Sequence, residues 1–363
     1  MTEFDVDVII PAHVSTRPVR RAVASVVDHT AAAVRVSVVA HNIDPSIIAA
    51  NLGEYADRPD VRLLALHDDI PSPAGPFNHG LDLATAPYFA LLGSDDEFAA
   101  GAVDSWLSIA RETGATTVLA RIDRKTSGVD PLPPTRIGRD RDLDAVKDRL
   151  SYRCAPLGLV SREAFPTLRF TPGLGSGEDL DFTAQLWFRG RRIAYDRSGP
   201  AYIGHEDESD RVTGATRTVA QDFAFLGAIE ASAWYPRLTR SQRTALAVKT
   251  IRLHYFDAAW RRIESAEGLS AHRAALDEVM DRIERMSPLA LSLLSRADHH
   301  AIRTIRDPAA TVDEVRAAMR GRWTGGPLGM KVPRQPLLML HRQAPLATMR
   351  AMVAPTSADR GGE

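Results

Sequence analysis

Residues 87–98 of this chain read PYFALLGSDDEF, and they decide how the rest of the sequence is interpreted. The run from Pro87 to Leu92 is mostly apolar and has the length of a strand that is buried on both faces of a sheet. Gly93 and Ser94 interrupt the run, and three acids follow directly. Carboxylates at the carboxyl end of such a strand lie where open α/β sheets bind ligands, and they repel one another unless a cation lies between them. The stretch therefore indicates either a site for Mg²⁺ or Mn²⁺ or an acidic turn in solvent.

Strand-like and helix-like segments alternate before this stretch. Residues 6–11, 34–40 and 61–66 are rich in β-branched or apolar side chains, and each is followed by apolar residues at helical spacing. This order predicts a mostly parallel sheet with helices on both faces. No Gly-x-Gly-x-x-Gly follows the first strand and no Gly-x-x-x-x-Gly-Lys-Ser/Thr occurs, which argues against a dinucleotide-binding fold and a P-loop NTPase.

The character of the sequence changes near residue 210. Short strand patterns continue up to residue 203, and arginine-rich amphipathic helical patterns then replace them at 219–235, 240–264, 270–286, 288–305 and 311–319. We therefore expect an α/β domain at 1–212, a helical domain at 213–320 and a basic tail rich in proline and glycine at 321–363. The tail mixes apolar stretches with lysine and arginine, which fits packing on the domain, a partner protein or a membrane surface.

The composition excludes several classes of protein. The chain has 363 residues with 44% hydrophobic and 25% charged residues, as is typical of globular proteins. Its formal net charge of -1 gives no field that would attract nucleic acid, and its single cysteine, Cys154, excludes an intramolecular disulfide. It has no apolar run of about 18 residues and no basic start of a signal peptide. We expect a cytoplasmic protein, with at most peripheral contact with the inner face of a membrane.

Three motifs occur in a characteristic order. The first strand ends in IIPAH at residues 9–13, residues 78–88 (NHGLDLATAPY) lead into LLGSDD at 91–96, and GEDLDF follows at 177–182. Together, over residues 5–210, they resemble the family 2 glycosyltransferases, which have the GT-A fold, a Rossmann-like α/β sheet. The resemblance implies an inverting enzyme that uses a nucleotide-sugar donor, a divalent metal (Mg²⁺ or Mn²⁺) and a hydroxyl acceptor, such as a cell-surface glycan or its precursor.

The resemblance also implies roles for individual residues. Asp95 and Asp96 match the acids that hold the metal, and Asp95 also matches a ribose contact. Asp179 matches the base that takes the proton of the acceptor hydroxyl, and Glu178 contacts the acceptor or orients Asp179. His205 matches a histidine that contacts metal or phosphate in some members, although a lone histidine is more often structural.

Further residues are expected to bind the nucleotide-sugar: Pro11, Ala12, His13, Asn42, Asp44, Asp69, Asn78, Ser94 and Asp95. The sequence departs from the family at three places. Gly93 stands where an acid is common, residues 40–42 (AHN) replace paired acids that read the base, and Phe77 replaces an arginine. Asn42 or Asp44 would have to replace the contact with the base. These departures leave the identity of the donor's nucleobase open, and a UDP-sugar is the donor that we expect first.

Two other functions compete with this hypothesis. A nucleotidyltransferase on a similar sheet would need a basic glycine loop after the first strand, and residues 11–17 lack one. A catalytically weak nucleotide-sugar-binding scaffold is the non-enzymatic alternative, because Gly93 removes one acid. The arginine-rich helices are candidates for a homo-oligomer interface, but a solvated face explains them equally well.

Overall fold

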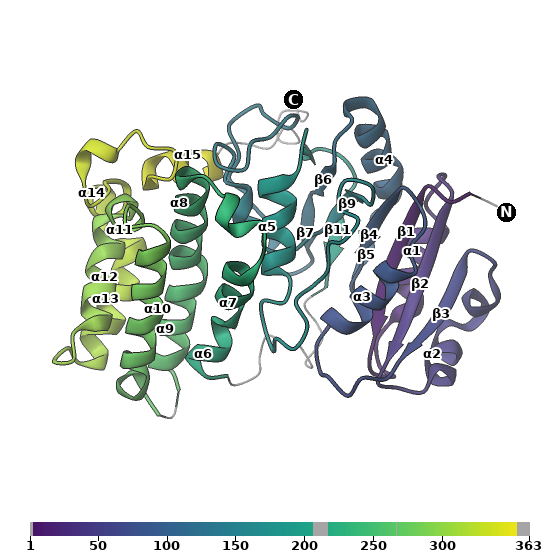
Figure 1. Cartoon of the computed structure of the whole chain (residues 1–363), viewed down its shortest axis with the longest axis horizontal. Helices are drawn as coiled ribbons and strands as arrows, with labels where there is room; N and C mark the ends of the chain where they lie inside the picture. Colours follow the sequence, from purple (N-terminus) through teal and green to yellow (C-terminus); the bar gives the residue numbers. More distant parts are fainter. Residues whose placement is uncertain (1–2, 206–216, 266, 354–363) are drawn as a thin grey trace.

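The computed structural model describes residues 3–205, 217–265 and 267–353. A seven-stranded sheet in the order β10-β6-β9-β4-β1-β2-β3 forms the centre of the α/β part (Figure 1). Its strands are β1 (Val6–Ala12), β2 (Val34–His41), β3 (Val61–Leu66), β4 (Tyr88–Leu91), β6 (Thr117–Ala120), β9 (Gly158–Ser161) and β10 (Ala194–Asp196). All neighbours pair in parallel except β9, which runs antiparallel to β4 and β6. The predicted α/β fold with a mostly parallel sheet is confirmed.

Alternating side chains along β1 give the sheet one core on each face. Val8 and Ile10 lie in the core that α1, α2 and α4 cover, whereas Ile9 lies in the core that α3 and α5 cover. These helices are α1 (Val19–Val27), α2 (Pro45–Leu52), α3 (Ala74–Asp82), α4 (Ala102–Thr113) and α5 (Leu180–Arg189). Burial on both faces explains why the central strands read as nearly continuous apolar runs.

A smaller sheet joins the end of β4 to the end of the α/β part. Its order is β5-β11-β7-β8, with β5 (Glu97–Phe98), β7 (Ile122–Arg124), β8 (Gly128–Val129) and β11 (Tyr202–Gly204). The antiparallel pair β5–β11 places Tyr202 opposite Phe98 and Ile203 opposite Glu97. The acids that follow β4 therefore lie beside the residues that follow β11.

Gly158, at the start of β9, is required by the close approach of β6. Its φ is +131°, and a Cβ at this position would lie 2.0 Å from the carbonyl oxygen of Val118. Only glycine fits such a position without moving the neighbouring strand. The antiparallel strand β9 thus fits between β6 and β4, because the backbones of β6 and β9 can approach each other closely at Gly158.

The helical domain packs around a separate core that includes Leu180 and Ala184 of α5. Its helices are α6 (Val219–Asp222), α7 (Ala224–Ala231), α8 (Arg240–Lys249), α9 (Phe256–Ile263), α10 (Arg273–Met286), α11 (Ala290–Leu293), α12 (Arg296–Arg306) and α13 (Val312–Thr324). A π-helical turn, η5 (Thr250–Tyr255), joins α8 to α9, so the predicted helix at 240–264 is continuous. The predicted helix at 288–305 is instead two helices, because Ser295 caps α12 by accepting a hydrogen bond from the backbone of Asp298.

The predicted tail is partly helical and packs against the rest of the chain. It contains α14 (Gly326–Lys331) and α15 (Pro345–Val353), and α13 extends to Thr324, past the expected domain end at 320. Gln343 is buried and donates a hydrogen bond of 2.9 Å to the carbonyl oxygen of Val146. The expected boundary at 212 lies outside the described residues. None of the described helices is both long and apolar enough to cross a bilayer.

Candidate active site

A pocket of about 570 Å³ opens at the carboxyl ends of β1, β2 and β4. Six residues that the sequence assigned to the site line it: Pro11, His13, Asn42, Ser94, Asp95 and Glu178. Open parallel sheets bind ligands at this edge, and the volume suits a small-molecule ligand. The structure thus brings together motifs that are more than 160 residues apart in the chain.

Four other residues assigned to the nucleotide-sugar site lie outside the lining of this pocket. Ala12 is fully buried, and Asp44 caps α2 by accepting a hydrogen bond from the backbone N–H of Ser46. Asp69 is exposed. Both ends of the Asn78 amide bond the backbone of Phe170, at 3.0 and 2.8 Å. Asp44 thus fixes the start of α2, and Asn78 fixes α3 to the segment at Phe170.

The pocket also has lining residues that the sequence did not single out as binding residues. They include Arg17, His41, Phe77 and the loop from Pro71 to Pro76. The Phe77 ring stacks on Phe170 with centroids 5.0 Å apart, so the residue that replaces an arginine gives the pocket an aromatic wall. His41 could have been identified as a binding residue from the sequence, because it directly follows a predicted strand. Nothing in the sequence marked Phe77 as a binding residue.

The ends of β2 and β3 are tied together beside this pocket. His41 Nε2 lies 2.8 Å from Asp68 Oδ1, and the Asn42 side-chain oxygen accepts hydrogen bonds from the backbone N–H groups of Asp68 and Asp69 at 3.0 and 3.1 Å. Asn42 adopts a positive φ of 55°, which asparagine tolerates better than most residues. This network fixes the ends of β2 and β3 beside the pocket, where the contact with the nucleobase was expected.

The acids after β4 are paired with basic groups. Asp95 Oδ2 forms an ion pair of 2.5 Å with Arg17, and the Asp95 carbonyl oxygen accepts a hydrogen bond from Arg21. Glu97 lies 3.5 Å from Arg21 Nε and 2.5 Å from His205 Nε2. The stretch is thus a partly buried charge network and not an acidic turn in open solvent.

Asp96 is held by the strand β11 and the residue that follows it. Its Oδ2 accepts a hydrogen bond of 2.5 Å from the Tyr202 hydroxyl, and its Oδ1 accepts one of 2.9 Å from the His205 backbone N–H. Burial raises the pKa of the Asp96 carboxyl. A Cβ at Gly93 would lie 2.8 Å from Asp96 Oδ2 and 3.0 Å from Asp95 Oδ1. Glycine at 93 therefore lets both carboxyl groups fold back over the backbone.

These carboxylates fit a divalent cation that is held jointly with a ligand. Within the described ranges, no three Asp, Glu, His or Cys side chains form a complete metal site. Mg²⁺ and Mn²⁺ nevertheless commonly bind through one or two carboxylates plus the phosphates of a substrate. A buried carboxyl with a raised pKa, as at Asp96, is the kind of group whose negative charge a cation would stabilise. The His205 ring, expected as a further ligand, lies 2.5 Å from Glu97 Oε1, next to Asp96 in the chain.

The glycine-rich loop before α5 brings two more acids to the same side of the sheet. Glu178 lines the large pocket together with Asp95, and Glu178 and Asp179 both line an adjoining cavity of about 200 Å³. Gly177, with a φ of +75°, turns the chain directly before them. Asp179 therefore does not lie on the far side of the sheet from the acids of β4.

Asp179 has the electrostatics of a group that titrates near neutral pH. Burial, with the charge of Glu178 second, raises its pKa to about 7, and the positive charge of Lys249 opposes this rise. Lys249 is buried at the end of α8, and His254 comes from the π-helical turn that follows. Such turns occur frequently at functional sites. His254 Nε2 lies 4.0 Å from Cys154 Sγ, and burial holds the pKa of His254 well below its usual value.

Comparison with known families agrees with this geometry. Residues 7–169 match the model of glycosyl transferase family 2. Residues 7–169 therefore form a family 2 glycosyltransferase domain. No curated protein sequence matches the chain significantly.

Solved structures extend the likeness beyond the family 2 domain. Crystal structures of S. aureus TarS 1-349 in complex with UDP-GlcNAc and with UDP superpose with TM-scores of 0.71 and 0.66, at 16% and 15% identity, and each alignment covers 89% of this chain and 92% of that chain. A structure of S. aureus TarS gives 0.65 at 16% identity, covering 88% of this chain and 55% of that chain. The expected GT-A fold is confirmed, and the coverage includes much of the helical domain.

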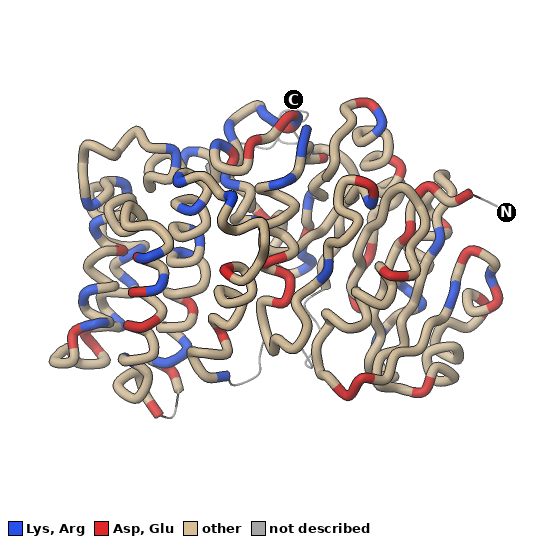
Figure 2. The backbone as a smooth tube through the Cα atoms, viewed as in Figure 1, with Lys and Arg blue, Asp and Glu red and all other residues tan. Residues whose placement is uncertain are grey.

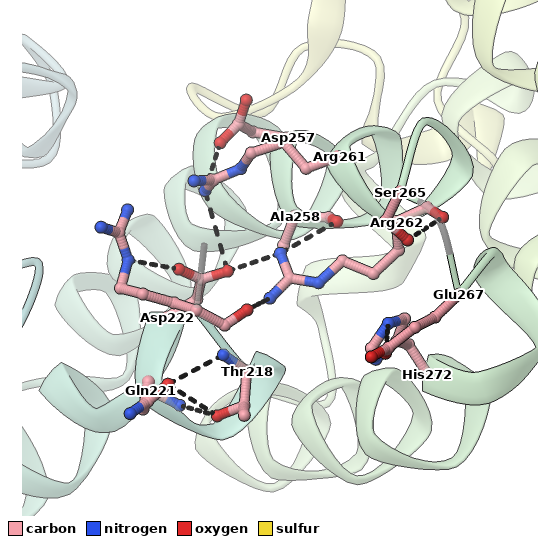
Figure 3. A network of polar contacts seen from close by, with 11 residues as sticks. Thr218, Gln221, Asp222, Asp257, Ala258, Arg261, Arg262, Ser265, Glu267 and His272 are labelled. Atoms are coloured by element: carbon pink, nitrogen blue, oxygen red, sulfur yellow. Dashed lines mark hydrogen bonds and ion pairs between the residues drawn. The ribbon is translucent and has the colours of Figure 1, made fainter. Parts of the chain in front are cut away.

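The helical domain supplies the remaining wall of the smaller cavity beside the family 2 domain. Asp222 and Arg261 line the cavity, and Figure 3 shows how arginines surround Asp222. Asp222 Oδ1 accepts a hydrogen bond of 3.0 Å from Arg217, Asp222 Oδ2 forms an ion pair of 2.6 Å with Arg262, and Arg261 lies 3.8 Å away. Arg262 also donates a hydrogen bond of 2.7 Å to the Arg217 carbonyl oxygen. This nearly buried cluster fixes α6 against α9 at the edge of the cavity.

Proposed function

We propose that the protein is an inverting glycosyltransferase that moves a sugar from a UDP-sugar to a hydroxyl group of a glycan or glycan precursor. The observation that carries the proposal is that Asp95 and Glu178 line one pocket, with Asp179 next to them in an adjoining cavity. Family membership of residues 7–169 supports the activity. The UDP-GlcNAc and UDP complexes of the similar TarS structures support the choice of donor.

The large pocket accommodates the donor in this proposal. Pro11, His13 and Asn42 surround the nucleoside, at the ends of β1 and β2. Arg17 places a positive charge beside Asp95, where the diphosphate would lie. Asp95 and Asp96 would hold Mg²⁺ or Mn²⁺, which would neutralise the charge that develops on the leaving diphosphate.

Asp179 acts as the general base in the smaller cavity. With a pKa of about 7, roughly half of its carboxyl groups are ionised at neutral pH, which suits a group that must accept a proton. The acceptor oxygen forms a bond to the anomeric carbon while the bond from that carbon to the diphosphate oxygen breaks. The hydroxyl proton passes to Asp179, and Glu178, between the two cavities, orients the acceptor.

Two experiments test this proposal. A thermal-shift panel of nucleotides and nucleotide sugars, with and without Mn²⁺, should show the largest stabilisation with a UDP-sugar and Mn²⁺. Slow release of UDP from that donor would distinguish an enzyme from a binding scaffold, which would release none.

Asp179→Asn should retain donor binding and lose nearly all turnover, whereas Asp82→Asn, at an exposed ion pair with Arg169, should change neither. Near-normal turnover of Asp179→Asn would exclude Asp179 as the base.

A further inference from the structure

Exposed large apolar side chains concentrate near the C-terminal end of the described chain. Five of the eleven in the described residues lie between positions 323 and 352: Trp323, Leu328, Leu337, Leu340 and Met352. Leu337 and Leu340 are 91% and 92% exposed, more than any of the others. Scattered exposed apolar residues are normal, but a concentration in one segment indicates an interaction surface.

The exposed leucines are presented by a segment that is anchored at both ends. Before them, the Arg334 backbone N–H donates a hydrogen bond of 2.8 Å to the Leu294 carbonyl oxygen. After them, Gln343 is fully buried and bonds the Val146 carbonyl oxygen. Leu337 lies in a short helical turn, Pro336–Leu338, between these anchors. The apolar side chains therefore project from backbone that packing elsewhere already holds.

The same segment carries charge of one sign. Residues 315–353 contain seven arginines and lysines and no aspartate or glutamate. Arg316 and Arg322 pair with acids from other parts of the chain. The other five are exposed and form no ion pair with any described residue: Arg320, Lys331, Arg334, Arg342 and Arg350. Figure 2 shows blue residues without red ones along the upper left edge, where Figure 1 places α14 and α15.

We propose that residues 323–352 dock on an anionic lipid bilayer. Leucine and tryptophan side chains insert into the boundary between head groups and acyl chains, and arginines and lysines contact the anionic head groups. Charge complementarity favours an anionic bilayer over a second copy of this segment as the partner. Two copies of the segment would bring two sets of unpaired positive charges together. The chain as a whole has a net charge of only -1, so the positive charge that attracts anionic lipid is local to this edge. A chain without a large positive field is not expected to bind nucleic acid.

Vesicle co-sedimentation of the full chain tests the proposal without any donor or acceptor. The protein should sediment with phosphatidylcholine vesicles that contain about 30% phosphatidylglycerol, and much less with phosphatidylcholine alone. The double variant Leu337→Ser, Leu340→Ser should weaken binding at least about tenfold. Arg334→Gln with Arg342→Gln should weaken it roughly fivefold per residue. Ile137→Ser is the matched control, since Ile137 is exposed in the α/β domain.

A second measurement uses only the unaltered protein, in case a variant misfolds. Hydrogen exchange with anionic vesicles present should slow in residues 323–352 and not elsewhere. Equal binding to neutral vesicles, no binding to either vesicle, or protection elsewhere would overturn the proposal. The same holds if the leucine variant changes the oligomeric state while vesicle binding persists, because the segment would then be a protein interface. UDP release measured without vesicles should be unchanged in every variant, so failure of this proposal leaves the enzymatic one intact.

Discussion

Replacing Asp179 by asparagine should stabilise the protein while it abolishes transfer. The folded structure raises the pKa of this carboxyl from 3.8 to about 7. At about 1.4 kcal/mol per pH unit, keeping the carboxylate ionised costs the folded state about 4 kcal/mol. Because the side chain is only partly buried, solvent screens part of this cost, and we expect a gain of about 2–4 kcal/mol from Asp179→Asn. The amide keeps the shape and removes the charge that burial and Glu178 disfavour.

The gain should depend on pH with a defined sign. A carboxyl with a raised pKa binds its proton more tightly in the folded state, so its contribution to stability is complete below about pH 4 and is lost as the pH rises to about 7. The difference between variant and wild type should therefore be small near pH 4, grow between pH 4 and 7, and stay constant above. Glu178 and Lys249, whose charges act on Asp179, and Cys154 and His254, which line the same cavity, remain in both proteins.

Thermal or urea unfolding of both proteins at a series of pH values measures this difference. Above neutral pH, the melting temperature of Asp179→Asn should exceed that of the wild type by a few °C. Asp82→Asn is the control, and it should follow the wild type at every pH. Parallel pH curves for the wild type and Asp179→Asn would refute the reasoning, because the carboxyl would then have an ordinary pKa. Near-normal turnover of the same variant would refute its role as a base.

Three further substitutions give distinct outcomes. Lys249→Met should move the acid limb of the pH–rate profile to higher pH and lower the rate at neutral pH about tenfold for each unit by which the pKa of Asp179 rises. Lys249→Arg, which keeps the positive charge, should restore part of the rate at neutral pH. An unchanged pH–rate profile for Lys249→Met would contradict this role of Lys249. Asp96→Asn should weaken UDP binding by calorimetry about tenfold with Mn²⁺ and little with EDTA, so equal losses would count against a metal role. Asp222→Asn should cost about 3–5 kcal/mol in urea unfolding, since Arg262 would remain buried without its partner, and a loss below about 1 kcal/mol would argue against the cluster.

The class of fold could be predicted from the sequence, and so could the edge of the sheet at which the candidate site lies. Apolar runs of strand length separated by helical patterns predict a parallel sheet, because a strand buried on both faces reads as a nearly continuous apolar run, whereas a helix that packs on the sheet shows a helical period. The family resemblance assigned His13 and Asp95 to one nucleotide-sugar pocket, and the ends of parallel strands do meet at one edge of the sheet. The motif at 178–179 was recognised by its order and by the glycine loop before it.

Which side chains contact one another depends on the tertiary structure. The antiparallel entry of β9, through Gly158, and the pairing of Tyr202 with Asp96 depend on strand register, which local patterns do not encode. The position of Lys249 behind Asp179 depends on how the helical domain packs on α5, since the two residues are 70 positions apart. A pKa near 7 arises from that packing, because desolvation and neighbouring charges act through space and not along the chain.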